Sequence, residues 1–277
     1  MAVAELTLLG GFELRLASGE VIDLPGQKDR ALLAVLALRP GSSFSREKLA
    51  GLLWSDRGDA QARDSLKHSL SRLRQLFAFT TAQPVIADRH SVRFDASEVG
   101  VDVALFEQLS GDGTTAAWER AARLYRGDFL DGIAVRDPAF DDWLDVERQR
   151  LRHAGEQALE TLIGRYLEAG AAERAEEVAR RLLSLDPLCE SACRALMEID
   201  AARARPTEAI KRYEAFRDRL KRDLRVEPEP GMPTDSSRAP TRMPRHRRTS
   251  IPQAAASRDV WLSRAGISAA GTALPNR

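Results

Sequence analysis

The feature that most constrains the fold is a regular spacing of helix-like segments in the second half of the chain. These segments begin near Gly155, Ala172, Cys189 and Pro206, so that every second one is separated by 34 residues. This spacing is the period of tetratricopeptide repeats, in which each pair of helices buries its apolar sides only against neighbouring pairs. The sequence therefore predicts that the helices from about residue 140 onward form one right-handed stack.

The first part of the chain has a different pattern. Residues 5–24 alternate apolar and polar side chains, which indicates short antiparallel strands. The segments "DRALLAVLALRPG", "SREKLAGLLW" and "ARDSLKHSLSRLRQLF" have helical spacing, and "PVIADRHSVRF" reads as two short strands joined at residues 88–90. Strands, three helices and a hairpin in this order are typical of a winged helix-turn-helix.

These patterns together predict a mainly α fold with a small β component. Residues 1–97 are expected to form a winged helix-turn-helix domain, and residues 98–227 an all-α helical domain of tetratricopeptide-like repeats. Residues 228–277 are rich in proline, serine and arginine without apolar periodicity, so they are predicted to be a disordered tail.

The third helix, residues 62–77, carries most of the functional signal. Its net charge is +3, although the segments 1–97, 98–227 and 228–277 have net charges of +2, −6 and +5. A stripe of apolar side chains faces inward, and the outward side carries Arg63, Lys67, His68, Ser71, Arg72 and Arg74. Such a face can enter the major groove of DNA, where arginine pairs with guanine and lysine contacts phosphate. A merely solvated basic face is the alternative, and the two preceding helices and the hairpin favour DNA.

The sequence gives no support for an enzyme, a metal site or a membrane protein. The four histidines are scattered, and Asp141, Asp142, Asp145 and Glu147 near Trp143 are interpreted as solvated charges and partners of a helix dipole. Cys189 and Cys193 are too few for a zinc site or a disulfide framework and are expected to be buried. Because no run approaches the ~18–20 apolar residues of a membrane span and no signal peptide is visible, a cytoplasmic protein without cofactor or metal is expected.

Several segments resemble the SARP family of bacterial transcriptional activators over roughly residues 5–230. They are "GQKDRALLAVLALRPG", "SREKLAGLLW", "RDSLKHSLSRLRQLF", "YRGDFLDG", "FDDWLDVERQRLR", "LDPLCESACRALMEIDAA" and "EAIKRYEAFRDRLKRDLRVEPEP". The resemblance implies an OmpR-like winged helix-turn-helix followed by a bacterial transcriptional activator domain. It also implies head-to-tail binding to direct repeats in promoters and recruitment of RNA polymerase.

The resemblance further assigns roles to individual residues. Residues 62–77 become the recognition helix, and Arg89 and Arg93 serve the wing. The loop before the recognition helix can touch RNA polymerase, which here points to Trp54, Ser55, Asp56 and Arg57. Long family members carry an ATPase or sensor region, but this chain has no GxxxxGK[ST] phosphate loop, so nucleotide-driven control is not expected.

The function expected from the sequence is that of a sequence-specific DNA-binding transcriptional regulator, an activator that binds promoter direct repeats. Its partners would be double-stranded DNA, RNA polymerase and a second copy of itself on DNA. The alternative is a protein-interaction scaffold of tetratricopeptide type with a vestigial winged helix, because the acidic balance of residues 98–227 would suit a basic partner.

Overall fold

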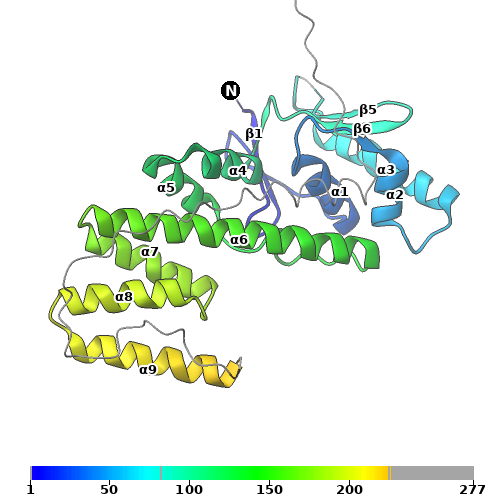
Figure 1. Ribbon diagram of the computed structural model, residues 1–277. Helices are drawn as coiled ribbons and strands as arrows, with labels where there is room; N and C mark the ends of the chain where they lie inside the picture. Colours follow the sequence, from blue (N-terminus) through cyan, green and yellow to red (C-terminus); the bar gives the residue numbers. More distant parts are fainter. Residues whose placement is uncertain (1, 82, 224, 226–277) are drawn as a thin grey trace, which may run out of the picture. The chain divides into compact units, whose positions relative to one another are not determined.

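The computed structural model describes residues 2–81, 83–223 and 225, and Figure 1 shows their arrangement. The chain begins with a four-stranded sheet in the order β3-β2-β1-β7. Strands β1 and β2 pair antiparallel, as do β2 and β3, whereas β7 runs parallel to β1 with Val101 opposite Leu6. The sheet therefore unites the first strands with a strand that lies beyond the hairpin. The strands are β1 (Ala4–Thr7), β2 (Glu13–Leu16), β3 (Val21–Ile22) and β7 (Val99–Val101).

The next elements are three helices and a hairpin, in the order that the sequence predicts. Residues 31–38, which include the C-terminal end of the first helix, are all buried, because the two following helices and one hairpin strand pack on this helix. The hairpin strands pair antiparallel and extend into a three-stranded sheet in the order β4-β6-β5. The elements are α1 (Gln27–Ala37), β4 (Phe44–Ser45), α2 (Arg46–Leu53), α3 (Asp59–Leu76), β5 (Val85–Ala87) and β6 (Ser91–Phe94).

Beyond β7 the described chain is helical, and successive helices from α6 to α9 pack on one another (Figure 1). One apolar core is shared by α6, α7 and α8, and a second one, around Phe216, lies between α8 and α9. The cores form because apolar side chains recur at helical spacing on the facing sides. The helices are α4 (Asp102–Asp112), α5 (Thr115–Leu124), α6 (Pro138–Glu168), α7 (Ala172–Leu185), α8 (Glu190–Ala202) and α9 (Pro206–Asp223).

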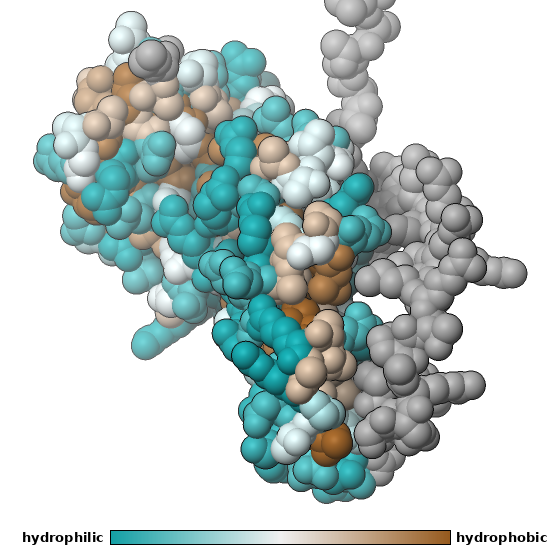
Figure 2. All heavy atoms as spheres, turned by 90° about the vertical axis from the view of Figure 1, so that its left-hand side faces the viewer, coloured by the Kyte–Doolittle hydropathy of each residue, from teal (hydrophilic) through white to brown (hydrophobic). Residues whose placement is uncertain are grey.

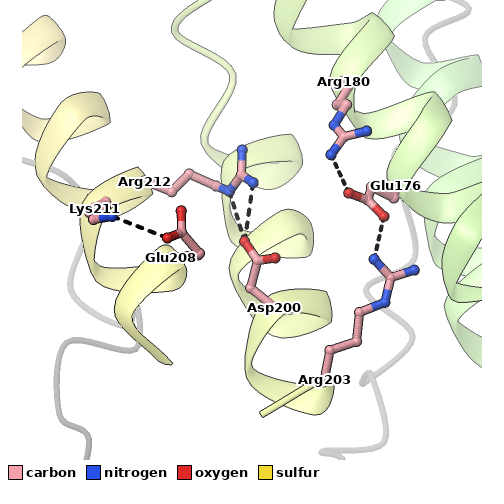
Figure 3. Close-up of polar contacts among 7 residues, drawn as sticks. All are labelled: Glu176, Arg180, Asp200, Arg203, Glu208, Lys211 and Arg212. Atoms are coloured by element: carbon pink, nitrogen blue, oxygen red, sulfur yellow. Dashed lines mark hydrogen bonds and ion pairs between the residues drawn. The ribbon is translucent and has the colours of Figure 1, made fainter. Parts of the chain in front are cut away.

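Ion pairs join α7, α8 and α9, as Figure 3 shows. Glu176 of α7 accepts hydrogen bonds from Arg180 of its own helix and from Arg203 at the end of α8. The buried carboxylate of Asp200 in α8 receives two hydrogen bonds, of 3.1 and 3.2 Å, from Arg212 of α9. On the side of the molecule drawn in Figure 2, hydrophilic side chains run along the helical region with apolar ones between them.

One prediction about the repeats is wrong. No helix begins near Gly155, because α6 continues through this residue as one helix over Pro138–Glu168. The glycine marks a close approach instead, since a Cβ at this position would lie 2.7 Å from the ring of Tyr125. The helices that begin at Ala172 and Pro206 preserve the 34-residue spacing.

The segment between α5 and α6 ties the helical region to the first sheet. Leu9 forms a β-bridge with Phe129, and the amide of Leu130 donates to the carbonyl of Leu8 at 2.8 Å. Gly10 has a φ of +95°, and a Cβ there would lie 3.0 Å from the Cβ of Arg126, so only glycine fits without strain. The "YRGDFLDG" segment is therefore part of the packing between the two regions.

The predicted tail, residues 228–277, lies outside the described residues. Within residues 2–81, 83–223 and 225, the structure contains no helix that is long and apolar enough to span a membrane.

Candidate nucleic-acid interface

Helix α3 turns its apolar stripe inward and all six predicted contact residues outward. Leu66, Leu70 and Leu73 are buried together with Ala62 and Ser69. The spacing of these residues matches the helical period, so the opposite side of the helix faces solvent. The exposed residues there include Arg63, Lys67, His68, Ser71, Arg72 and Arg74.

A groove of about 600 Å³ lies between the N-terminal half of α3, the start of α2 and the tip of the β5–β6 hairpin. It brings together Arg63 and Lys67 from the helix and Arg89 from the hairpin. Arg46 adds a fourth cation, whereas Glu47 and Asp64 are the carboxylates at the groove. The full lining is Ser45, Arg46, Glu47, Arg63, Asp64, Leu66, Lys67, Arg89 and His90.

Three cations of this groove have no counterion bound to them within the described part of the protein. Among the residues that the structure describes, Arg63, Lys67 and Arg89 have no hydrogen-bond or ion-pair partner, and neither has Arg93 on the exposed side of β6. Excess positive charge without an internal counterion attracts an anionic ligand. The groove is thus suited to an anion.

The hairpin tip is held in a fixed conformation next to the groove. Arg46 donates from Nη1 to the carbonyl of Asp88 at 3.1 Å and from its amide to the carbonyl of His90 at 3.0 Å. Asp88 accepts hydrogen bonds of 2.7 Å from the Ser91 hydroxyl and from the amides of His90 and Ser91. The Ser91 hydroxyl, followed by these amides, lowers the pKa of Asp88 to about 2. Arg46 was not among the residues predicted to contact DNA, and its place at the start of the segment "SREKLAGLLW" was a usable signal.

Arg72 has a different environment from the groove cations. Its Nε and Nη2 donate to the two carboxylate oxygens of Asp29 at 2.6 and 2.8 Å, and Nη2 also donates to the Ser69 hydroxyl. Asp29 lies in the first turn of α1 and is buried, so Arg72 supplies the counterion that this carboxylate needs. The hydrogen bond to Asp29 raises the pKa of Arg72. The guanidinium therefore joins α3 to α1.

Arg74 also makes contacts within the protein. It donates from Nη2 to the carbonyl of Ala87 at 3.2 Å and, more weakly, from Nε to that of Val85 at 3.4 Å. These contacts attach the end of α3 to β5. His68 and Ser71 lie exposed between the groove residues and the pair Arg72 and Arg74. Neither makes a side-chain hydrogen bond among the described residues.

The loop from α2 to α3 is only partly available to a partner. Trp54 is buried, and Ser55 donates to the carboxylate of Asp137 from its amide at 3.0 Å and its hydroxyl at 2.7 Å. Asp56 and Arg57 are exposed, and Arg57 donates to the hydroxyl of Ser65 in α3 at 2.8 Å. A partner that approaches this loop would meet these last two residues.

The cysteines are buried, as predicted, and both are free in the structure. Burial raises the pKa of Cys193 to about 11, so its thiol is protonated at neutral pH. In the described part of the chain, no group of three or more histidine, cysteine, aspartate and glutamate side chains is arranged to hold a metal ion.

Comparison with known proteins identifies the family. The sequence model of the bacterial transcriptional activator domain matches residues 95–234, half of the chain. The chain belongs to the SARP family of bacterial transcriptional activators. The resemblance seen in the sequence is thereby confirmed.

Relatives of this SARP-family chain are regulatory proteins. It is 26% identical over 228 residues to the regulatory protein AfsR of Streptomyces coelicolor and 26% identical over 217 residues to AfsR of Streptomyces griseus. The matches cover 77% and 76% of this chain but 22% of each relative. The chain thus spans about a fifth of the length of these relatives.

A solved structure has a similar fold. It is that of Mycobacterium tuberculosis EmbR in complex with a low affinity phosphopeptide, with a TM-score of 0.65 and 21% identity. The match covers 83% of this chain and 63% of that chain. The mainly helical architecture with small sheets is therefore one that EmbR shares.

Proposed function

We propose that this chain regulates transcription by sequence-specific binding to DNA, with residues 1–97 as a winged helix-turn-helix domain and residues 98–227 as a tetratricopeptide-like activator domain. The observation that carries the proposal is the groove in which Arg63, Lys67 and Arg89 meet without internal partners. A helix in the major groove with a hairpin beside it would place cations from both elements along one DNA strand. Family membership supports the regulatory role.

We divide the proposed DNA contacts into two kinds according to the environments of the side chains. Arg63, Lys67 and Arg89 would meet backbone phosphates, because a phosphate between two elements can be reached from both. His68 and Ser71 would meet base edges, since they lie exposed on the middle of α3. Arg93 would extend the phosphate contacts along the hairpin. Arg72 and Arg74 would hold α3 in place.

Two copies are proposed to bind head-to-tail on promoter direct repeats in the cytoplasm. RNA polymerase would contact the loop between α2 and α3 at Asp56 and Arg57, because the structure leaves these two side chains exposed. The buried Trp54 would support the loop from inside, and the hydrogen bonds of Ser55 to Asp137 would hold its first residues in place.

The test is a selection of genomic fragments by the purified protein at physiological salt, followed by sequencing. Enrichment of two similar motifs in tandem, about one helical turn apart, would support head-to-tail reading of a direct repeat. Binding without enrichment would reduce α3 to a phosphate contact. Absence of binding would refute the proposal and favour the protein-interaction scaffold.

A further inference from the structure

Asp137 occupies the N-cap position of α6, but its side chain does not cap that helix. An aspartate at this position ordinarily accepts a hydrogen bond from an amide of the first helical turn. Here the carboxylate makes no cap hydrogen bond, and both of its oxygens accept from Ser55 instead. The preceding Arg136 has a φ of +56°, a strained conformation for a non-glycine residue. The backbone thus turns Asp137 toward the N-terminal region.

The partners of this carboxylate all come from the N-terminal region. Asp137 is fully buried, and Lys28 of α1 approaches it with Nζ at 3.5 Å. The same ammonium group lies 3.7 Å from Asp56 and 5.6 Å from the ring centroid of Trp54. Burial raises the pKa of Asp137, but the Ser55 hydrogen bonds and Lys28 outweigh it, so the pKa is lowered and the group is ionised at neutral pH. A buried carboxylate therefore depends on the segment around Ser55 for its compensation.

The contact reaches α3 through a short path. Only residues 55–58 separate Trp54 from the first residue of α3. Within these residues, Ser55 is held by Asp137, and Arg57 is joined both to the carbonyl of Trp54 through its amide and to Ser65 of α3 through its guanidinium. A loop that is fixed at both ends transmits a displacement of one end to the other.

We propose that Asp137 of the activator domain is a positioning residue that sets the place of the N-terminal half of α3 for DNA binding. This inference rests on the proposed function, since it concerns the half of α3 that carries Arg63 and Lys67. It provides a route by which an event in the activator domain changes DNA affinity without touching the DNA contacts.

The experiment compares Asp137→Asn with a matched control, Glu119→Gln. Glu119 also accepts a hydroxyl, that of Tyr166 at 2.8 Å, and pairs with Arg174 at 2.7 Å, but its contacts join α5, α6 and α7 only. Two quantities are measured well below the unfolding temperature. They are the hydrogen-exchange rates of amides 62–67 in the free protein and the Kd for the DNA obtained by selection.

Asp137→Asn is expected to raise these exchange rates and the Kd roughly tenfold, the effect of weakening hydrogen bonds to a charged acceptor. Glu119→Gln should leave both at wild-type values even where it lowers the unfolding temperature. Ser55→Ala, at an exposed position, should reproduce the effect in milder form, and adding it to Asp137→Asn should change little more. If Asp137→Asn does not fold, Ser55→Ala alone decides the matter.

The inference is overturned if Asp137→Asn has the exchange rates and the Kd of the wild type. If Asp137→Asn does not fold, the same result for Ser55→Ala overturns it. Equal loosening of α3 by Glu119→Gln would overturn it as well, because the effect would then be one of general stability. If the wild-type protein binds no DNA, the proposed function fails, and unchanged exchange of amides 62–67 is then the result that separately refutes the positioning role.

Discussion

The two halves of helix α3 carry the same kinds of side chain in different surroundings. In the first half, Arg63 and Lys67 face the groove beside the hairpin tip and have no partner among the described residues. In the second half, Arg72 pairs with buried Asp29, and Arg74 donates to backbone carbonyls of β5. The helix thus has an end that is free to bind and an end that is fastened to the protein.

This difference shows that exposure does not by itself separate binding residues from supporting ones. The side chain of Arg72 is 54% exposed, yet both carboxylate oxygens of Asp29 are bonded to it. A basic helix face can therefore contain residues whose charge is already compensated. We therefore expect substitutions in the first half of α3 to change mainly DNA affinity and substitutions in the second half to change mainly stability.

The largest expected effect is on DNA affinity in the first half. Replacing Arg63 and Lys67 together by glutamine should weaken binding roughly hundredfold at fixed salt and reduce the salt dependence by about two phosphate contacts. Titrations of labelled DNA at several salt concentrations measure both quantities. Arg120→Gln with Arg165→Gln removes the same charge from exposed positions in α5 and α6. A similar loss in this control would mean that only the net charge matters.

The next effect is on stability in the second half. Arg72→Ala should lower the free energy of unfolding by about 1–2 kcal/mol, since Asp29 loses its charged donors while solvent partly compensates at the exposed guanidinium. Urea denaturation gives the value. Arg63→Ala serves as the control and should stay within about 0.5 kcal/mol of the wild type. If Arg72→Ala keeps the stability of the wild type but loses its preference between bases, Arg72 contacts DNA and does not support α3.

The sequence was sufficient to predict the three helices and the hairpin of the N-terminal region and the orientation of α3. The leucine spacing determines which side of the helix is buried, and the hairpin follows from two short strands around residues 88–90. The same periodicity could not separate Arg72 from Lys67, because both lie outside the apolar stripe. The difference comes from Asp29, a buried carboxylate in the first turn of α1 whose charge requires a cation from elsewhere in the fold.

Contacts between distant residues lay beyond sequence reasoning. Ser55 and Asp137 are 82 residues apart, and Asp137 before a proline reads as an ordinary helix cap. Gly155 similarly reads as a break between helices, whereas the structure uses it for close contact with Tyr125. In each case the local sequence pattern suggests a common role for the residue, whereas tertiary packing gives it a different role.

A smaller effect is expected where α3 meets the hairpin. Arg74→Ala should lower the free energy of unfolding by about 0.5–1 kcal/mol, because its two hydrogen bonds to carbonyl groups are long and partly exposed. Hydrogen exchange should become faster in β5 and stay unchanged in α1. Arg93→Ala, on the exposed side of β6, is the matched control. If Arg74→Ala leaves β5 unchanged but weakens DNA binding as strongly as the groove substitutions, both halves of α3 bind DNA.

The smallest effect concerns Asp88, whose carboxylate shapes the hairpin tip beside Arg89. The pKa of Asp88 is about 2, which lies below the usual value of about 3.9 in an unfolded chain. Asp88 therefore stabilises the fold above about pH 4, and this contribution is lost as the pH falls through 2. A titration of the Asp88 carboxyl carbon by NMR should give the low value, and Ser91→Ala should raise it. An ordinary pKa in the wild type would mean that the tip is not fixed, and Arg89 would then reach DNA from a flexible turn.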